Sequence, residues 1–466
     1  MKITQVSLCQ SEATAKAGRP ALTPELLAAS GARYSRNNEG LEAILSKIDP
    51  ANLEKSVDGI FKMVDYGHQS IADMVPVAMF IDGISIWMAY YIWTLCPTAG
   101  GQESSTRYIK IEGLIPPGNL GIPEQAAAEW QERMQKYFAA YQEALKVWEE
   151  LSHINPALMG IPKSLLEDAS EKSQKKVVRM RRNYAFDRAR NFLPVSAETN
   201  MMMIMSARGW VNLCQFLLSH PLPEPRQVGA LIRQELELSA PRMLRHARST
   251  PDHQQAHAQE FQKLINLAKA DASFWEGNLE RESAVPSLSV LPLENISTAE
   301  LADDFLAHSN RYSPIGSGLQ RLAVRFSWSS MGFAEIRDLN RHRTGSKYSP
   351  QVPRGFYFAK DQIPDMPPEH KSRLLELSQI GWEATARAAK LLQEGDPSYI
   401  YWVVLGTEFP FEHTTTADKF IYETELRTGI GAHFRYAKHM RDVLALWYQK
   451  FPETKGRLLE GSAEPE

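Results

Sequence analysis

The sequence runs through the same series of features twice, and this internal repeat constrains the fold more than any other feature. In the first half, a helix ending at 31–35 precedes an apolar segment around Phe80 and then a polar loop. In the second half, a helix ending at 310–313 precedes an apolar segment around Phe326, also expected to be a helix, and another polar loop. Short strings can match by chance, but a series in the same order indicates two diverged copies of one unit.

Local patterns predict the elements of each copy. The opening KITQVSLC alternates as a half-buried strand does. Helices are predicted at 23–30, 49–63, 123–150, 163–190, 200–218, 224–248 and 253–281. The Pro-containing segment SAVPSLSVLPLEN marks a boundary followed by a strand. We therefore expect an α+β protein: an N-terminal repeat at 1–248, a helical linker at 249–285 and a C-terminal repeat at 286–466. Each repeat would hold a small sheet with long helices, and further helices would be inserted.

The apolar stretch at 74–96 is long enough to cross a bilayer. Its one charged residue is Asp82, and Pro76 and Gly83 interrupt it. No basic cluster flanks it to set a topology. We expect a helix buried inside the fold, and no membrane partner.

Composition narrows the classes of function. The 466 residues carry 52 Lys+Arg against 55 Asp+Glu, a formal charge of -3. Binding to a nucleic acid polymer is therefore not expected, because it usually shows a basic surplus. The three cysteines, few and far apart, favour a reducing cytoplasm. His253 and His257 are spaced by one helical turn but lack an HExxH motif, so no metal site is expected.

Two polar runs carry the side chains best suited to chemistry. RHRTGS at 341–346 combines three basic side chains with two hydroxyls, and Arg forks suit phosphate and carbonyl oxygens. QESSTRY at 102–108 places a carboxylate, hydroxyls and a guanidinium on one short loop. Each run taken alone would be read as an ordinary solvated patch or turn. They occupy the same relative place in the two halves.

With these residues, the sequence resembles the flavin-dependent thymidylate synthases (the ThyX family). The front half has the GHxS-like Gly67-His68-Gln69-Ser70 and the loop Glu103-Ser104-Ser105-Thr106-Arg107-Tyr108 at the family spacing. It has Leu95-Cys96-Pro97 in place of the family RHR, whereas the back half keeps Arg341-His342-Arg343 and lacks the loop.

The later motifs divide in the same way. The front half keeps Arg190 before a Leu-Pro turn, followed by Arg208 and Asn212. The back half has Trp402, Asp418 and Tyr422 at those three places, but keeps the Leu-Arg that ends at Arg427. Each copy thus lacks what the other retains. We expect one composite site, with two chains in a homodimer imitating the family's four-subunit assembly. The alternative is that both halves drifted and no site survives.

The resemblance implies that dUMP is converted to dTMP with FAD, NADPH and methylenetetrahydrofolate. It implies catalytic roles for Arg107 and Arg427, which would polarise the pyrimidine or hold phosphate. The implied nucleotide-binding residues are Glu103, Ser105, Arg107, Arg190 and Arg427. The implied flavin-binding residues are Arg341, His342, Arg343, Ser346, Asn212 and His68. The altered loops leave two alternatives open: flavin-dependent modification of another pyrimidine nucleotide, and a non-catalytic relative that binds a nucleotide or assembles.

Overall fold

A computed structural model of the chain describes residues 1–34, 40–49, 52–65, 69–159, 161, 163–271, 285–291, 298–363 and 366–463. The chain forms two compact units, and each is described by itself. Unit 1 comprises Met1–Ser104, Ile111–Glu124 and Ser196–Gln262. Unit 2 comprises Ser105–Lys110, Gln125–Val195 and Lys263–Glu466. The repeat boundaries expected near residues 248 and 286 stay a prediction.

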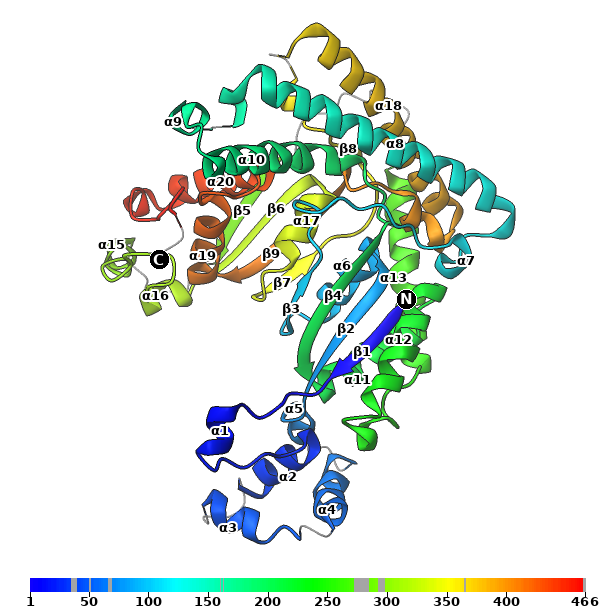
Figure 1. Cartoon of the computed structure of the whole chain (residues 1–466), viewed down its shortest axis with the longest axis vertical. Coiled ribbons are helices and arrows are strands. Elements are labelled where there is room, and N and C mark those ends of the chain that lie inside the picture. The colour runs from blue at the N-terminus through cyan, green and yellow to red at the C-terminus, as the bar shows by residue number, and fades with distance from the viewer. Residues whose placement is uncertain are drawn as a thin grey trace. The chain divides into compact units, whose positions relative to one another are not determined.

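A four-stranded antiparallel sheet forms the centre of unit 1, in the order β1-β2-β4-β3 (Figure 1). Its strands are β1 (Lys2–Val6), β2 (Pro76–Ser85), β3 (Gly100–Glu103) and β4 (Glu198–Ser206). Two long strands lead directly into helices, β2 into α6 (Ile86–Leu95) and β4 into α11 (Ala207–Leu218). The Ser85 and Ser206 hydroxyls at these junctions each accept a hydrogen bond from a first-turn backbone N–H.

The remaining elements of unit 1 are mostly short helices. The described helices are α1 (Glu12–Lys16), α2 (Pro24–Tyr34), α3 (Leu41–Ser46), α4 (Leu53–Asp65), α5 (Ser70–Asp73), α7 (Pro117–Leu120) and α12 (Pro223–Leu236). Helix α13 (Pro251–Ala270) begins in this unit, and its expected continuation beyond residue 271 lies outside the described residues. The predicted first strand is confirmed.

Unit 2 holds a second antiparallel sheet, in the order β5-β6-β9-β7, with β8 also paired to β9. Its strands are β5 (Pro286–Leu291), β6 (Ala323–Gly332), β7 (Ser346–Tyr348), β8 (Gly355–Phe356) and β9 (Thr407–Thr416). Helix α17 (Phe333–Asn340) follows β6, and α19 (Ala417–Thr428) follows β9. Further helices are α8 (Glu124–Ile154), α9 (Lys163–Glu167), α10 (Glu171–Ala189), α15 (Thr298–Asp303), α16 (Ser317–Gln320), α18 (Pro368–Glu394) and α20 (Phe434–Lys450).

The two sheets share their strand order, their pairing and the position of an irregularity. In both, the second strand shifts register just before its helix, at Ile81/Ile84 and at Trp328/Met331. The first strand pairs with the second, and the last strand lies between the second and third. The α+β class and the two similar sheet-and-helix arrangements expected from the sequence are confirmed.

Three predicted helices are wrong in their first part. Residues 76–85, 198–206 and 323–332 are strands, and helix begins only at the cap that follows each of them. Residues 198–206 and 323–332 alternate in burial, whereas 76–85 is buried on both faces, and all three segments are rich in β-branched, aromatic or Met side chains. Because strand and helix join without an intervening loop, each apolar run is long enough to imitate one buried helix.

The register also corrects the matching of Phe80 with Phe326. Phe80 pairs with Met202, and the position equivalent to Phe80 in the second sheet is Ser327, paired with Glu412. A shift of one residue moves a side chain to the other face of a sheet. Accordingly, Phe80 is 44% exposed whereas Phe326 is fully buried.

Two long helices of unit 2 run side by side in opposite directions, as Figure 1 shows for α8 and α18. Arg387 pairs with Glu129, and Arg373, a few turns earlier in α18, pairs with Glu143 farther along α8. The predicted helix at 163–190 is interrupted at 168–170. There the Asp168 side chain accepts the Ser170 backbone N–H, a local bond that competes with helix.

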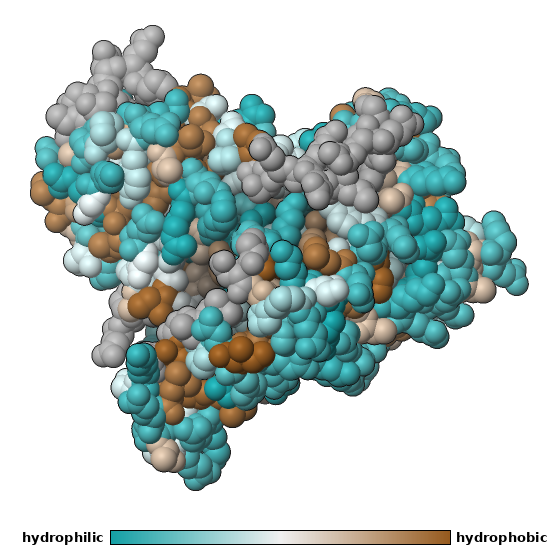
Figure 2. Space-filling view, turned by 90° about the horizontal axis from the view of Figure 1, so that it is seen from above, coloured by the Kyte–Doolittle hydropathy of each residue, from teal (hydrophilic) through white to brown (hydrophobic). Residues whose placement is uncertain are grey.

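Among the described residues, no helix is both long enough and apolar enough to cross a bilayer. The stretch at 74–96 is divided between β2 and α6, so it forms no single spanning helix. Hydrophilic residues make up most of the face seen from above, with small hydrophobic patches among them (Figure 2).

Candidate functional site

Arg107 lies on the loop that follows β3, and this part of the loop belongs to unit 2. Its guanidinium forms a two-pronged ion pair with Asp187 near the end of α10. The distances are 2.7 Å from Nε to Oδ1 and 2.9 Å from Nη2 to Oδ2. Ser105 steadies the loop, because its hydroxyl accepts the Arg107 backbone N–H at 3.1 Å. Burial would raise the pKa of Asp187, but His433 and the bonded Arg107 hold that pKa below its usual range.

Arg190 lies one turn beyond Asp187, where α10 passes into a short 3-10 helix (Arg190–Phe192). Its side chain is 1% exposed. Nη2 donates to Asp338 Oδ2 at 3.0 Å, and Nη1 lies 3.5 Å from the Thr106 hydroxyl oxygen. Arg190 thereby joins the front-half loop to helix α17 of the back half.

Asp338 stands at the centre of the site. Its second carboxylate oxygen accepts Arg341 Nη2 at 2.8 Å, and its backbone carbonyl accepts Arg427 Nη2 at 2.8 Å. Burial would raise the pKa of Asp338, but Arg190, Arg341, Arg427 and Arg107 lower it far below its usual range. We call Arg107, Arg190, Arg341 and Arg427 the arginine cluster.

His342 points inward and orients a member of the cluster. Arg427 Nε donates to His342 Nε2 at 2.7 Å, which requires an unprotonated nitrogen there. Burial lowers the pKa of His342 to about 3, so the ring is neutral near pH 7. The Arg427 guanidinium also lies over the Tyr436 ring, 5.1 Å from its centroid, and the Tyr436 hydroxyl is 3.4 Å from Arg107 Nη1.

The other predicted site residues lie elsewhere. Arg343 and Ser346 are exposed residues of unit 2. Glu103 and Asn212 belong to unit 1. Asn212 lines a cavity of about 120 Å³ together with Arg208, which is bonded to Asp73 at 2.8 Å. His68 lies outside the described residues.

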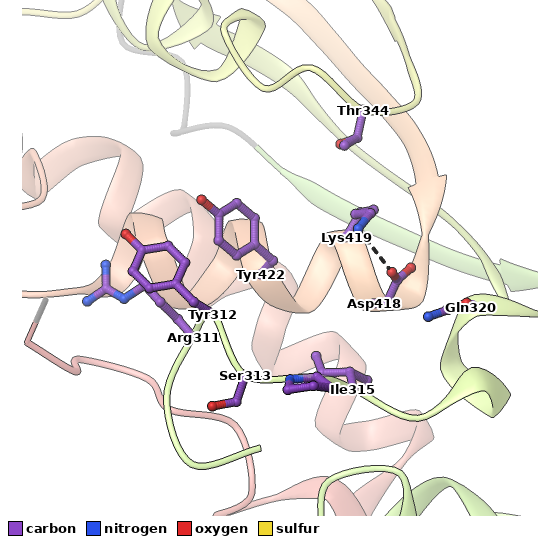
Figure 3. Close-up of a pocket in the computed structure, with 10 residues that line it drawn as sticks. Arg311, Tyr312, Ser313, Ile315, Gln320, Thr344, Asp418, Lys419 and Tyr422 are labelled. Atoms are coloured by element: carbon purple, nitrogen blue, oxygen red, sulfur yellow. Dashed lines mark ion pairs between the residues drawn. The ribbon is translucent and has the colours of Figure 1, made fainter. Parts of the chain in front are cut away.

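A larger cavity of about 470 Å³ opens in unit 2 beside Thr344, directly after the RHR segment (Figure 3). Tyr312 and Tyr422 stand on one side of it with ring centroids 6.2 Å apart. Lys419 lies at its edge and pairs with Asp418 at 3.3 Å. Aromatic rings, hydroxyls and an ammonium suit a flat heteroaromatic group with polar edges, and the volume lies in the range of small-molecule pockets. These residues therefore fit part of a flavin cofactor.

Sequence reasoning missed the acidic partners, Asp187 and Asp338, as well as Tyr436. Asp338 could have been found, because it precedes Arg341 by three residues on a helix and such residues are neighbours on one face. Asp187 could not have been found in this way, because its partner Arg107 lies 80 residues away in the sequence. No pattern links Tyr436 to Arg107, which is distant in sequence. In the described part of the chain, no group of three or more metal-ligating side chains is found.

The chain is similar to a protein family, to one protein along most of its sequence and, weakly, to one solved structure. Residues 21–242 match the family model described as thymidylate synthase complementing protein. The chain is 24% identical over 473 residues to the UPF0159 protein Ta1429 of Thermoplasma acidophilum, covering 90% of this chain and 91% of that protein. It also resembles the crystal structure of a UMP/dUMP methylase, PolB from Streptomyces cacaoi, bound with 5-Br dUMP. That likeness has a TM-score of 0.31 and 15% identity, over 53% of this chain and 93% of that one.

The matched segment contains the loop with Arg107, the turn with Arg190 and the helix with Asn212. This match over residues 21–242 supports the family resemblance expected from the sequence motifs.

Proposed function

We propose that the chain is an enzyme that binds a pyrimidine nucleoside monophosphate at the arginine cluster and methylates dUMP at C5. The observation that carries the proposal is the cluster itself. All four arginines lie close enough to Asp338 to lower its pKa. Arg107 and Arg190 come from the segment that matches the family model, and Arg341 and Arg427 come from the back half. This juxtaposition supports one composite site built from both halves.

The charge of the cluster suits a nucleotide. Arg107, Arg190 and Arg341 pair with two carboxylates that are held ionised, Asp187 and Asp338, and Arg427 bonds the Asp338 backbone carbonyl. Four positive and two negative charges leave two positive charges in excess. A phosphate monoester carries about -1.5 to -2 at pH 7. Guanidinium groups bind such an anion through paired, charge-assisted hydrogen bonds.

Flavin would be held in unit 2 by the residues beside the RHR segment, with Thr344, Lys419, Tyr312 and Tyr422 lining the cavity. When bound, FAD would supply the redox chemistry, with NADPH as the reductant and methylenetetrahydrofolate as the donor of the carbon that becomes the methyl group. The exposed Arg343 and Ser346 would contact its outer parts.

The protein's own contribution is position and charge. Arg427 is fixed by His342, by the Asp338 carbonyl and by the face of Tyr436. A guanidinium held in this way can stabilise negative charge that develops on a pyrimidine oxygen without reorganising during the reaction. Arg107 and Arg190 would hold the phosphate.

The test is tritium release from dUMP labelled at C5, with FAD, NADPH and methylenetetrahydrofolate supplied. The wild-type protein should release tritium, and Arg107→Ala or Arg427→Ala should each lower the rate by about a hundredfold or more, as loss of one transition-state donor does. Arg325→Ala is the control, because Arg325 is exposed and, within the described part of the chain, forms an ion pair with Glu412, a residue outside the arginine cluster. It should retain the wild-type rate.

The failures are informative. Release that does not need the folate would indicate a different flavin-dependent modification. Binding of dUMP without release would indicate a non-catalytic nucleotide-binding relative. Equal loss of activity in Arg107→Ala and Arg325→Ala would show that the cluster has no special role.

A further inference from the structure

Behind the arginine cluster lies a buried carboxyl group that the proposed chemistry does not use. Glu335 is on α17, one turn before Asp338, and is 0% exposed. Its Oε1 lies 3.8 Å from Arg190 Nη2, too far for a hydrogen bond. Within the described part of the chain, neither oxygen of Glu335 accepts a hydrogen bond, and Arg190 Nε donates none. A buried carboxyl group thus lies beside a buried guanidinium without a hydrogen bond between them.

The carboxyl group has little room to move away from Arg190. A Cβ built on Gly332 would overlap Glu335 Oε2, so the carboxyl packs directly on that backbone. Leaving a buried polar group unpaired costs about 1–3 kcal/mol, and a buried charge costs more. The side chain is therefore held where its protonation state acts directly on Arg190.

Charged and titratable groups face Glu335 from several elements. They are Arg190 from the turn after α10, Arg435 from α20, Asp338 from its own helix, Glu408 from β9, and the un-ionised Tyr357. Burial raises the pKa of Glu335 to about 7, against the lowering effect of Arg190 and Arg435. The group is thus poised to gain or lose a proton near neutral pH.

We propose that Glu335 is a positioning residue that couples nucleotide binding at the arginine cluster to the uptake of a proton. This inference rests on the proposed function only in its choice of ligand. When Glu335 is ionised, it shares the charge of Arg190 with Asp338 and weakens the hold on an anion. When Glu335 is protonated, Asp338 alone opposes Arg190, and the remaining charge is available to phosphate.

The proton balance follows from linkage. An anion bound beside Arg190 disfavours a second negative charge behind it, so binding raises the proton affinity of Glu335. Above about pH 7, the complex must take that proton from the buffer. The nucleotide's own phosphate, with a pKa near 6, is already ionised there and takes up none.

The test is calorimetric titration of the full chain with dUMP at pH 7.5, in buffers that differ in ionisation enthalpy. Wild-type protein should take up most of a proton per nucleotide bound, because part of Glu335 is already protonated at pH 7.5. Glu335→Gln should take up none, and its affinity should stay level between pH 7 and 8.5 while that of the wild type falls by up to about tenfold per pH unit. Glu412→Gln, a change at an exposed ion pair, should behave as wild type.

The outcomes separate the two proposals. Failure of the wild type to bind dUMP would overturn the proposed function, and this inference with it. Binding with equal proton uptake in wild type and Glu335→Gln would overturn this inference alone. Should Glu335→Gln not fold, the wild type still decides: uptake at pH 7.5 should vanish at pH 5.5, where Glu335 is already protonated, and uptake that persists there contradicts the proposal.

Discussion

At the scale of single residues, the site is organised by buried carboxylates rather than by the arginines that the sequence makes conspicuous. Asp338 receives Arg190 and Arg341 on its two oxygens and Arg427 on its carbonyl. Removing one partner of a buried ion pair costs about 3–5 kcal/mol, because the other charge is left alone. These carboxylates therefore hold the guanidiniums in place before any ligand arrives.

Two buried histidines predict how stability depends on pH. Burial lowers the pKa of both His342 and His433 to about 3. In the unfolded chain each would titrate near 6.5, so between pH 6.5 and 3 the unfolded state binds more protons than the folded state. Stability should be fully present above pH 6.5 and fall as the pH is lowered through this range.

Urea unfolding at pH 7.5, 6.5 and 5.5 measures this loss. His433→Gln should lose less stability than the wild type across the same interval. The variant lacks one of the two side chains that bind a proton in the unfolded state but not in the folded state. Equal losses of unfolding free energy in the wild type and in His433→Gln between pH 7.5 and 5.5 would contradict the assignment of a neutral, buried His433 ring.

At the scale of elements, the structure shows what a sequence pattern can and cannot reveal. The helix α8 and the strand β1 were predictable, because each shows one clear period and ends at a turn signal. The segment at 76–95 was not, because β2 and α6 follow each other without a break and both are buried. Burial on both faces removes the alternation that distinguishes strand from helix.

The turn that follows the RHR segment gives a test at this scale. Gly345 has φ of +64°, and a Cβ there would overlap the Thr414 carbonyl on β9. Gly345→Ala should therefore lose about 2–5 kcal/mol, the sum of left-handed strain and overpacking. It should also weaken dUMP binding by displacing Arg341.

Gly456→Ala is the matched control, because Gly456 has φ of +80° but no atom lies within 4 Å of the added Cβ. It should lose only the part due to strain, about 1–2 kcal/mol. Chemical denaturation of both variants measures the difference. Equal losses would show that the turn does not depend on its close approach to β9.

At the scale of the whole molecule, two sheets of identical strand order support the proposal that the chain arose by duplication of one unit. From the sequence, the complementary loss of motifs predicted that the loop with Arg107 meets the RHR segment, and within unit 2 these residues do surround Asp338. Asp187, Tyr436 and Glu335 could not be predicted, because their roles depend on packing between segments far apart in the chain.

Assembly into a homodimer stays a prediction, which sedimentation would test.

The most direct test of the composite site is the number of dUMP molecules bound per chain, measured by equilibrium dialysis at saturating nucleotide. A site shared by the halves predicts a single nucleotide per chain, lost both in Arg107→Ala, in the front half, and in Arg427→Ala, in the back half. The folded state of each variant is checked by circular dichroism. Two nucleotides per chain in the wild type, with one remaining in each variant, would show independent sites and contradict the account.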